Sequence, residues 1–260
     1  MIKDKRISLI IPCKNEEKGI ATTISHVPDY VDEIIVVDNG SSDNTAEVAK
    51  NAGAKVVTEN RKLNGIGYGY AHITGFANAT GDYIFAMDGD DTYPAYQIKD
   101  MFEYMLNNDF DFVVGHRLPL KTPEAIKPVR RLGIYILNIE ILFLYGRYIK
   151  DSLSGMWGVK KEAVPLLNLK MGDWNLSPEI KIAAMVNKNV KFGQFPIDHA
   201  VRDKEPSKQQ IWKTGTSHFL YILKRRFTDD CKILNFLRGE VSKPNQSSLR
   251  KPQHAVQGGK

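Results

Sequence analysis

The strongest constraint on the fold is the alternation of short apolar segments with helical patterns along the first half of the chain. The apolar segments are rich in β-branched residues and nearly continuous, which is typical of strands covered by helices on both faces. This alternation predicts a mostly parallel sheet wrapped in helices. We expect strands at 7–11, 33–37, 55–57, 83–87 and 111–114, and helices at 17–27, 45–51, 68–79 and 95–107.

The second half has a different pattern. Pro119, Pro123 and Pro128 interrupt the chain before a long apolar segment over 131–148. A segment that is apolar nearly all round predicts a helix that is buried or lies in a lipid interface. After 242 the residues are mainly polar or small, which predicts a disordered tail over 242–260. The remaining expected elements are helices at 161–169 and 177–189, a strand at 190–195, and a helix within 211–226.

Three polar loops follow the carboxyl ends of predicted strands, at 12–16, 38–43 and 88–91. Ligands of open α/β sheets bind outside these ends. In the third loop, Asp88 and Asp90 flank a glycine, and paired carboxylates suit a hard cation such as Mg²⁺. The same residues also form ordinary turns. In the second loop, the side chain of Asp38 either caps the turn or binds a nucleotide.

Two common nucleotide-binding motifs are not matched. The segment 65–69 reads Gly-Ile-Gly-Tyr-Gly and does not follow the first predicted strand, where a dinucleotide fingerprint belongs. The chain also has no Gly-x-x-x-x-Gly-Lys-Ser/Thr loop. We therefore expect neither a nicotinamide or flavin enzyme nor a P-loop nucleotidase.

Charge is distributed unevenly along the chain. The net charge is +6, but residues 1–130 hold 14 basic and 19 acidic side chains, and the rest of the chain carries +11. In the second half, aromatic and aliphatic residues at 219–223 precede a basic cluster at 224–226. A cation near an anionic bilayer contributes about 1 kcal/mol. Because charges interrupt the apolar segment at 132–148, we expect peripheral membrane contact without a spanning helix.

The expected location is cytoplasmic, on the cytoplasmic face of a membrane. The two cysteines, Cys13 and Cys231, have no metal-ligand spacing and form no disulfide framework, which favours a reducing compartment. The amino terminus is charged, and its apolar run over 7–11 is too short for a signal peptide.

Several short segments occur in a fixed order along the chain. They lie at 10–17 (Ile-Ile-Pro-Cys-Lys-Asn-Glu-Glu), 36–43, 75–84, 87–90 (Met-Asp-Gly-Asp), 115–117, 151–155 (Asp-Ser-Leu-Ser-Gly), 178–179, 202 and 207–208. Together these segments resemble those of glycosyltransferase family 2 enzymes of the GT-A fold. The last of them are most similar to the dolichyl-phosphate mannose synthase group of polyprenyl-phosphate glycosyltransferases.

The resemblance implies a Rossmann-like, mostly parallel α/β sheet with flanking helices and C-terminal interfacial helices. It implies one domain over 1–227, with a nucleotide-sugar-binding part at 1–115 and an acceptor-binding, membrane-interface part at 116–227. The implied reaction moves a sugar, with inversion, from GDP-mannose, UDP-glucose or a UDP-N-acetylhexosamine to a polyprenyl or dolichyl phosphate.

The resemblance also implies roles for individual residues. Asp88 and Asp90 would hold Mg²⁺ or Mn²⁺ on the donor diphosphate. The implied catalytic residues are Asp90, Arg117, Arg202 and Lys208, and the implied substrate-binding residues are Pro12, Lys14, Glu16, Asp38, Asn39, Asp88, Gly89, Arg131 and Glu179.

This sequence departs from the group's pattern in two places. Thr92 stands where the mannose synthases commonly carry Gln or Ser, at the position of a third metal ligand. The group's Ser-Gly-Phe-Arg is replaced here by Ser-Gly-Met-Trp at 154–157, which removes an arginine and would alter the sugar or the acceptor.

Other functions fit the sequence as alternatives. A family 2 enzyme acting on a saccharide hydroxyl would need a carboxylate base, for which Glu179 and Asp151 are candidates. A non-catalytic nucleotide-sugar-binding protein would not require the intact pair Asp88 and Asp90. We expect no nucleic-acid partner, because the basic residues are mixed with long apolar segments and not with exposed stacking aromatics.

Overall fold

The computed structural model describes residues 4–202 and 209–228. The chain divides into two compact units, 1–223 and 224–260. The fold described below is that of the first unit, and in the second unit only the end of helix α7 (Ile211–Thr228) is described. Lys208, Cys231 and the tail predicted over 242–260 lie outside the described residues.

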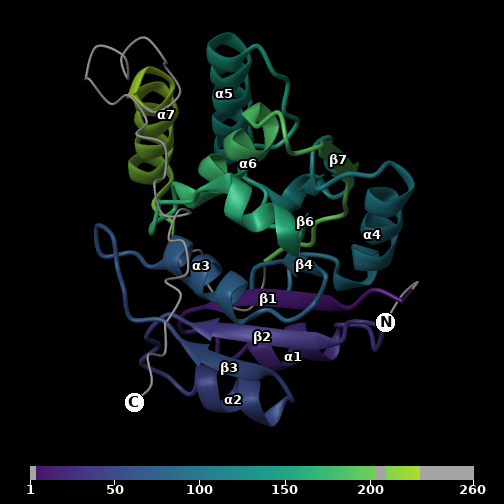
Figure 1. The fold of residues 1–260 in the computed structure, drawn as a ribbon. Coiled ribbons are helices and arrows are strands. Elements are labelled where there is room, and N and C mark those ends of the chain that lie inside the picture. The colour runs from purple at the N-terminus through teal and green to yellow at the C-terminus, as the bar shows by residue number, and fades with distance from the viewer. Residues whose placement is uncertain (1–3, 203–208, 229–260) are drawn as a thin grey trace, which may run out of the picture. The chain divides into compact units, whose positions relative to one another are not determined.

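A seven-stranded sheet forms the centre of the first unit (Figure 1). The strand order is β3-β2-β1-β4-β6-β5-β7. All neighbouring pairs are parallel except those of β6, which runs antiparallel to β4 and β5. The predicted mostly parallel α/β sheet is therefore confirmed. The strands are β1 (Ile7–Cys13), β2 (Glu33–Asp38), β3 (Lys55–Thr58), β4 (Tyr83–Ala86), β5 (Phe112–His116), β6 (Trp157–Lys160) and β7 (Phe192–Pro196).

Helices cover both faces of the sheet, so each strand buries both sets of alternate side chains. In β1, Leu9 and Ile11 lie in the core on one face of the sheet, whereas Ile10 lies in the core on the opposite face. This two-sided burial explains why the strand segments are continuously apolar. The helices and 3₁₀ turns before α7 are α1 (Ile20–Ser25), α2 (Thr45–Asn51), α3 (Tyr68–Asn78), η1 (Ala95–Gln97), α4 (Ile98–Asn107), η2 (Pro123–Ala125), α5 (Pro128–Tyr145), η3 (Lys161–Leu167) and α6 (Leu176–Val186).

Several elements differ from the sequence prediction, among them α1, which covers Ile20–Ser25 and not 17–27. Strand β6 was not predicted, because its four residues have no clear alternation. The segment expected as a helix at 161–169 forms the 3₁₀ helix η3, because Pro165 inside it lacks the N–H of a continuous α-helical ladder. Helix α5 begins at Pro128, three residues earlier than predicted, since proline fits the first helical turn.

The sheet topology brings distant loops to one edge. The carboxyl ends of β1, β2, β4 and β5 lie at the same edge, because these strands run in the same direction. Antiparallel β6 begins at that edge, so the segment 151–156 joins the loops there. Strands from 1–115 and from 116–227 thus share one sheet. Among the described residues, no helix is both long enough and apolar enough to span a membrane.

A buried histidine of α3, packed against Trp157 of β6, makes the stability of the fold depend on pH. The ring of His72 lies 5.1 Å from that of Trp157, and neither ring nitrogen has a hydrogen-bond partner within the described part of the chain. Burial, with a smaller contribution from Lys181, lowers the pKa of His72 to about 3.

The unfolded chain binds a proton at His72 more readily than the folded chain does. The contribution of neutral, buried His72 to the free energy of unfolding is therefore complete above the unfolded pKa and is lost as pH falls toward 3. We expect the free energy of unfolding to decrease between pH 7.5 and pH 5, with His72 accounting for about 2 kcal/mol of the decrease. Urea unfolding at both pH values should show a smaller decrease in His72→Phe than in the wild type. An equal decrease in both proteins would contradict this assignment.

Candidate active site

A cavity of about 840 Å³ lies at the edge of the sheet where these loops meet. Its wall includes the loops after β1, β2 and β4, the start of α3, and residues of α5 and α7. Nine of the residues predicted for the site line this cavity: Pro12, Lys14, Glu16, Asn39, Asp88, Gly89, Asp90, Arg117 and Arg202.

Hydrogen bonds hold the loops after β1 and β2 together. The backbone N–H of Asn15 donates to Ser41 Oγ at 2.9 Å, and the Asn15 side chain accepts from the N–H of Ser42 at 2.8 Å. The N–H of Glu16 donates to Thr45 Oγ1 at 2.8 Å. These contacts fix one wall of the cavity before any ligand binds.

The two aspartates after β4 have different environments. Asp88 accepts a hydrogen bond from the Tyr68 hydroxyl at 3.3 Å, whereas Asp90 accepts one from Thr92 Oγ1 at 2.6 Å. Burial, and next the negative charge of Asp90, raise the pKa of Asp88 to about 6. Gly155 leaves room for this carboxylate, because a Cβ there would lie 2.7 Å from Asp88 Oδ2. The pair is thus held close together at an electrostatic cost.

A divalent cation fits this pair of carboxylates. Mg²⁺ binds one or two protein carboxylates and takes its other ligands from phosphate oxygens and water. Among the described residues there is no group of three or more His, Cys, Asp or Glu side chains suited to hold a metal. Burial and then the charge of Asp90 raise the pKa of Asp88, and a bound cation would offset both effects by stabilising the ionised carboxylate. The residues therefore suit a metal shared with a diphosphate, and not a cage made by the protein alone.

Arg202 brings a positive charge to the same carboxylates. Its guanidinium donates to Asp90 Oδ2 at 2.5 Å and to Glu16 Oε1 at 3.1 Å. It therefore joins the loop after β1 to the loop after β4 and lies among the cavity-lining residues. Lys208, which we predicted to act with it, lies outside the described residues.

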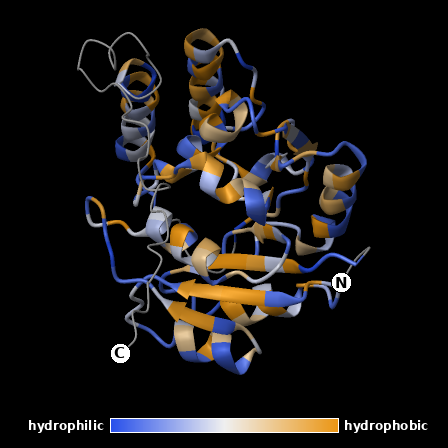
Figure 2. Cartoon of the chain, viewed as in Figure 1, coloured by the Kyte–Doolittle hydropathy of each residue, from blue (hydrophilic) through white to orange (hydrophobic). Residues whose placement is uncertain are grey.

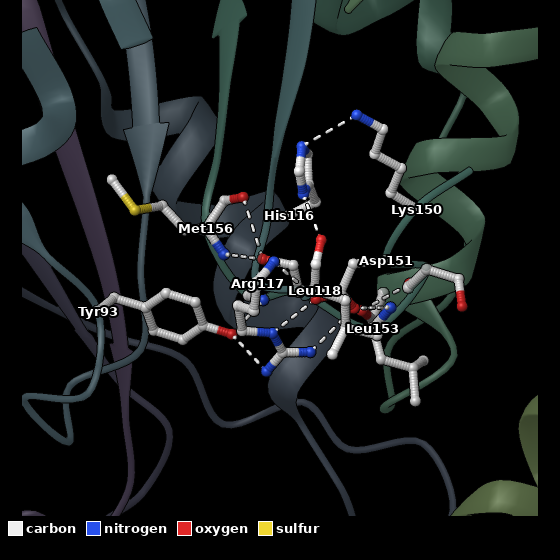
Figure 3. Close-up of polar contacts among 12 residues, drawn as sticks. Tyr93, His116, Arg117, Leu118, Lys150, Asp151, Leu153 and Met156 are labelled. Atoms are coloured by element: carbon white, nitrogen blue, oxygen red, sulfur yellow. Dashed lines mark hydrogen bonds and ion pairs between the residues drawn. The ribbon is translucent and has the colours of Figure 1, made fainter. Parts of the chain in front are cut away.

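Arg117 is held by a buried aspartate from the segment before β6 (Figure 3). Its Nε and Nη2 donate to the two carboxylate oxygens of Asp151 at 2.7 and 3.0 Å, and its backbone N–H also donates to Asp151. Asp151 has no exposed surface. Arg117 Nη1 donates to the Tyr93 hydroxyl at 3.1 Å. The guanidinium is therefore oriented within the protein and also lines the cavity.

Two further cations line the cavity from helices of the second half of the chain. Arg130 lies in the first turn of α5 and donates to the side chain of Gln209 at 3.2 Å, and Lys213 lies near the start of α7. The amino-terminal ends of helices favour anions. The part of the cavity wall that carries Arg130 and Lys213 therefore suits a phosphate group.

Three predicted site residues do not line the cavity. Asp38 accepts hydrogen bonds from the backbone N–H and the hydroxyl of Ser41, so it stabilises the turn after β2. Glu179 is buried and accepts from the backbone N–H groups of 170 and 171. Arg131 is not among the lining residues, whereas its neighbour Arg130 is. Substrate contacts by these three residues stay predictions.

The departure from the Ser-Gly-Phe-Arg pattern affects the core more directly than the cavity. Trp157 is buried and packs with Phe76 and Phe112, at ring distances of 5.4 and 6.1 Å. The expectation that this change alters the sugar or the acceptor has no support from the position of Trp157.

Sequence reasoning missed several residues of the cavity wall. Tyr68 and Trp174 have ring centroids 4.6 Å apart and line the cavity together. Asn64 lines it nearby and donates to Asp173 at 3.3 Å. The glycine-rich segment 65–69 is the one sequence signal in this part of the wall, and Gly65 and Gly67 line the cavity.

A comparison with protein-family models identifies the family of this chain. Residues 8–165 match the model described as glycosyl transferase family 2. The chain therefore belongs to glycosyl transferase family 2 and is a glycosyltransferase of the GT-A fold, as the sequence predicted.

Curated relatives include enzymes named for dolichyl-phosphate sugar transfer. A UDP-N-acetylglucosamine–dolichyl-phosphate N-acetylglucosaminyltransferase of Methanococcus voltae is 31% identical over 218 residues, covering 75% of this chain and 85% of that protein. A dolichol-phosphate mannosyltransferase of Pyrococcus furiosus is 29% identical over 213 residues, covering 78% of this chain and 59% of that protein. Glycosyltransferase AglJ of Haloferax volcanii is 28% identical over 230 residues, covering 86% of this chain and 73% of that protein. The predicted likeness to this group is confirmed.

Solved structures share the fold. Glucosyl-3-phosphoglycerate synthase of Mycobacterium tuberculosis, in complex with Mn²⁺, UDP and phosphoglyceric acid, aligns with a TM-score of 0.64 and 22% identity. The alignment covers 86% of this chain and 78% of that one. At this identity the likeness concerns the fold alone.

Proposed function

We propose that this protein transfers a sugar from a nucleotide sugar to the phosphate of a polyprenyl or dolichyl phosphate, with inversion and with the help of a divalent metal. The donor would be GDP-mannose, UDP-glucose or a UDP-N-acetylhexosamine. The observation that carries the proposal is the charge of the cavity lining. It contains the carboxylates Asp88 and Asp90 together with the cations Arg117, Arg130 and Lys213.

The chemistry follows from charge. An oxygen of the acceptor phosphate forms a bond to the anomeric carbon, while the bond from that carbon to the donor diphosphate breaks and the diphosphate leaves with the electron pair. Mg²⁺ or Mn²⁺ held by Asp88 and Asp90 would supply a Lewis acid for the leaving group. Arg202, which contacts Asp90, would stabilise negative charge beside them, and Arg117, which lines the cavity, would orient the incoming phosphate.

A general base is not needed for this acceptor, because a phosphate monoester is largely ionised near neutral pH. A hydroxyl acceptor would need a general base, and the contacts of the two candidate bases, Asp151 and Glu179, disfavour that role. Asp151 binds Arg117 through both oxygens, and Glu179 accepts backbone hydrogen bonds away from the cavity. These contacts favour a phosphate acceptor.

Binding of the donor can be tested with a thermal-shift panel. A ligand that binds the native state raises its melting temperature as its concentration exceeds the dissociation constant. We expect at least one nucleotide sugar to raise the melting temperature, and to do so more strongly with Mn²⁺ than with EDTA. A panel in which no nucleotide sugar has any effect would overturn the proposed function.

We propose that the protein contacts a lipid bilayer through α5 and α7, on the cytoplasmic face favoured by its cysteine usage. Figure 2 shows hydrophobic residues along α5. Their exposed members follow one face of the helix, and α7 exposes Trp212 and Leu220. Because both helices also line the cavity, a lipid phosphate could reach Arg117 from the bilayer. The large exposed apolar residues of α5 are Val129, Leu132, Tyr135, Ile136, Ile139, Leu142 and Phe143.

The membrane proposal predicts the effect of one surface substitution. Phe143 is 84% exposed, so Phe143→Asp should leave the fold intact. Binding to anionic phospholipid vesicles in a flotation assay should weaken about tenfold or more, because the buried area of one large apolar side chain is lost. Leu166→Asp, at an exposed leucine in η3, is the matched control and should bind like the wild type. Equal binding of all three proteins would contradict docking through α5.

A further inference from the structure

The buried hydroxyl of Tyr93 connects Arg117 to the turn that packs against Asp88. Tyr93 follows the loop that carries Asp88 and Asp90, and it is only 6% exposed. Its hydroxyl oxygen accepts a hydrogen bond from Arg117 Nη1 at 3.1 Å (Figure 3). It also accepts one from the backbone N–H of Gly155 at 2.6 Å. Burial raises the pKa of this hydroxyl, so it stays neutral.

Both partners of the hydroxyl face groups of the proposed reaction. Gly155 packs directly against the carboxylate of Asp88, since a Cβ at this glycine would lie 2.7 Å from Asp88 Oδ2. Arg117 lines the cavity, and Asp151 fixes its Nε and Nη2 but not its Nη1. Within the described residues, the Tyr93 hydroxyl therefore accepts the hydrogen bond from Nη1 of the guanidinium and also contacts the turn beside Asp88.

We propose that Tyr93 is a positioning residue, whose hydroxyl sets the orientation of Arg117 relative to Asp88. This inference rests on the proposed function only in taking Arg117 as the cation that meets the acceptor phosphate. Without the hydroxyl, the guanidinium can pivot about its bonds to Asp151. The turn at 154–156 then loses one of its attachments beneath Asp88.

The kinetic test uses Tyr93→Phe, which keeps the ring and removes only the hydroxyl. Loss of a hydrogen bond to a charged group should lower kcat for transfer to a short prenyl phosphate about tenfold or more, with little change in the KM of the donor. Tyr83→Phe is the matched control, because Tyr83 is buried on β4 outside the cavity lining. A kcat of Tyr93→Phe equal to that of the control would overturn the proposal.

A double-mutant comparison tests whether Tyr93 acts through Arg117. In an Arg117→Lys background the fork of donors is gone, so removal of the Tyr93 hydroxyl should lower kcat by less than about twofold further. Fully additive losses would show that the hydroxyl acts by another route.

The orientation of Arg117 can also be measured without any acceptor, which separates this inference from the proposed function. In the full chain labelled with ¹⁵N-arginine, the Arg117 Nη signals are assigned by their disappearance in Arg117→Lys. Exchange with water of the protons on Nη1, which donates to the Tyr93 hydroxyl, should be about tenfold faster or more in Tyr93→Phe and unchanged in Tyr83→Phe. If exchange is unchanged in Tyr93→Phe, the positioning role fails, whatever the acceptor proves to be.

Discussion

Asp90→Asn should reduce sugar transfer by about 10³-fold or more while leaving the fold intact. The substitution keeps the shape of the side chain but removes the charge that would hold a divalent cation, whose Lewis acidity contributes several kcal/mol to such reactions. Asn can still accept a hydrogen bond from Thr92, and Arg202 keeps its contact with Glu16. The measurements are the rate of transfer and the binding of Mn²⁺, followed by its electron paramagnetic resonance signal.

The neighbouring Asp91 provides a matched control. It pairs with His26 at 2.8 Å, does not line the cavity, and has a positive φ of 61° that asparagine also tolerates. Asp91→Asn should therefore transfer sugar and bind Mn²⁺ like the wild type. Full activity in Asp90→Asn would rule out the assigned role of the carboxylate pair.

Asp151→Asn should lower the free energy of unfolding by about 3–5 kcal/mol. The substitution leaves the buried guanidinium of Arg117 without its ionic partner, and removal of one member of a buried pair costs this much. Urea unfolding at neutral pH measures the loss, and sugar transfer should fall with it because Arg117 is no longer fixed.

An aspartate at the surface separates this effect from a general effect of losing a carboxylate. Asp109 pairs with Lys160 and Lys191 but is 66% exposed, so Asp109→Asn should change the stability only slightly. A loss in Asp151→Asn as small as that in Asp109→Asn would show that the buried pair contributes little to the fold.

The parallel half of the sheet could be predicted because its signals are local. The continuous apolar runs of β1, β2 and β4 reflect burial on both faces, and the polar residues after them mark the edge where the cavity lies. In these segments the strand pattern and the loop chemistry agree, so sequence reasoning placed Asp88 and Asp90 correctly at a strand end.

The rest of the site depends on contacts between distant segments. Arg117 meets Asp151 only because β6 runs antiparallel between β4 and β5, and the four residues of β6 carry no periodic signal. Arg130 and Arg131 are adjacent in sequence, yet only Arg130 lines the cavity, since successive helical residues point in different directions. Motif order locates such a segment but does not determine which side chain reaches the cavity.

Tyr93 shows the same limit at a single residue. It stands among turn-forming residues near Asp90, and its partner Gly155 lies far along the chain. Its contact depends on the segment before β6, so nothing in the local sequence distinguishes this tyrosine from one that merely fills the core.

The most direct test of the proposed function is a transfer assay with labelled nucleotide sugars. Each donor is incubated with a polyprenyl phosphate or with a panel of free sugars, in the presence of Mn²⁺ or EDTA. We expect labelled product in the organic phase only with the polyprenyl phosphate and Mn²⁺, and with the anomeric configuration of the donor inverted. Transfer to free sugars with none to the polyprenyl phosphate would contradict the phosphate acceptor and favour a saccharide-modifying enzyme.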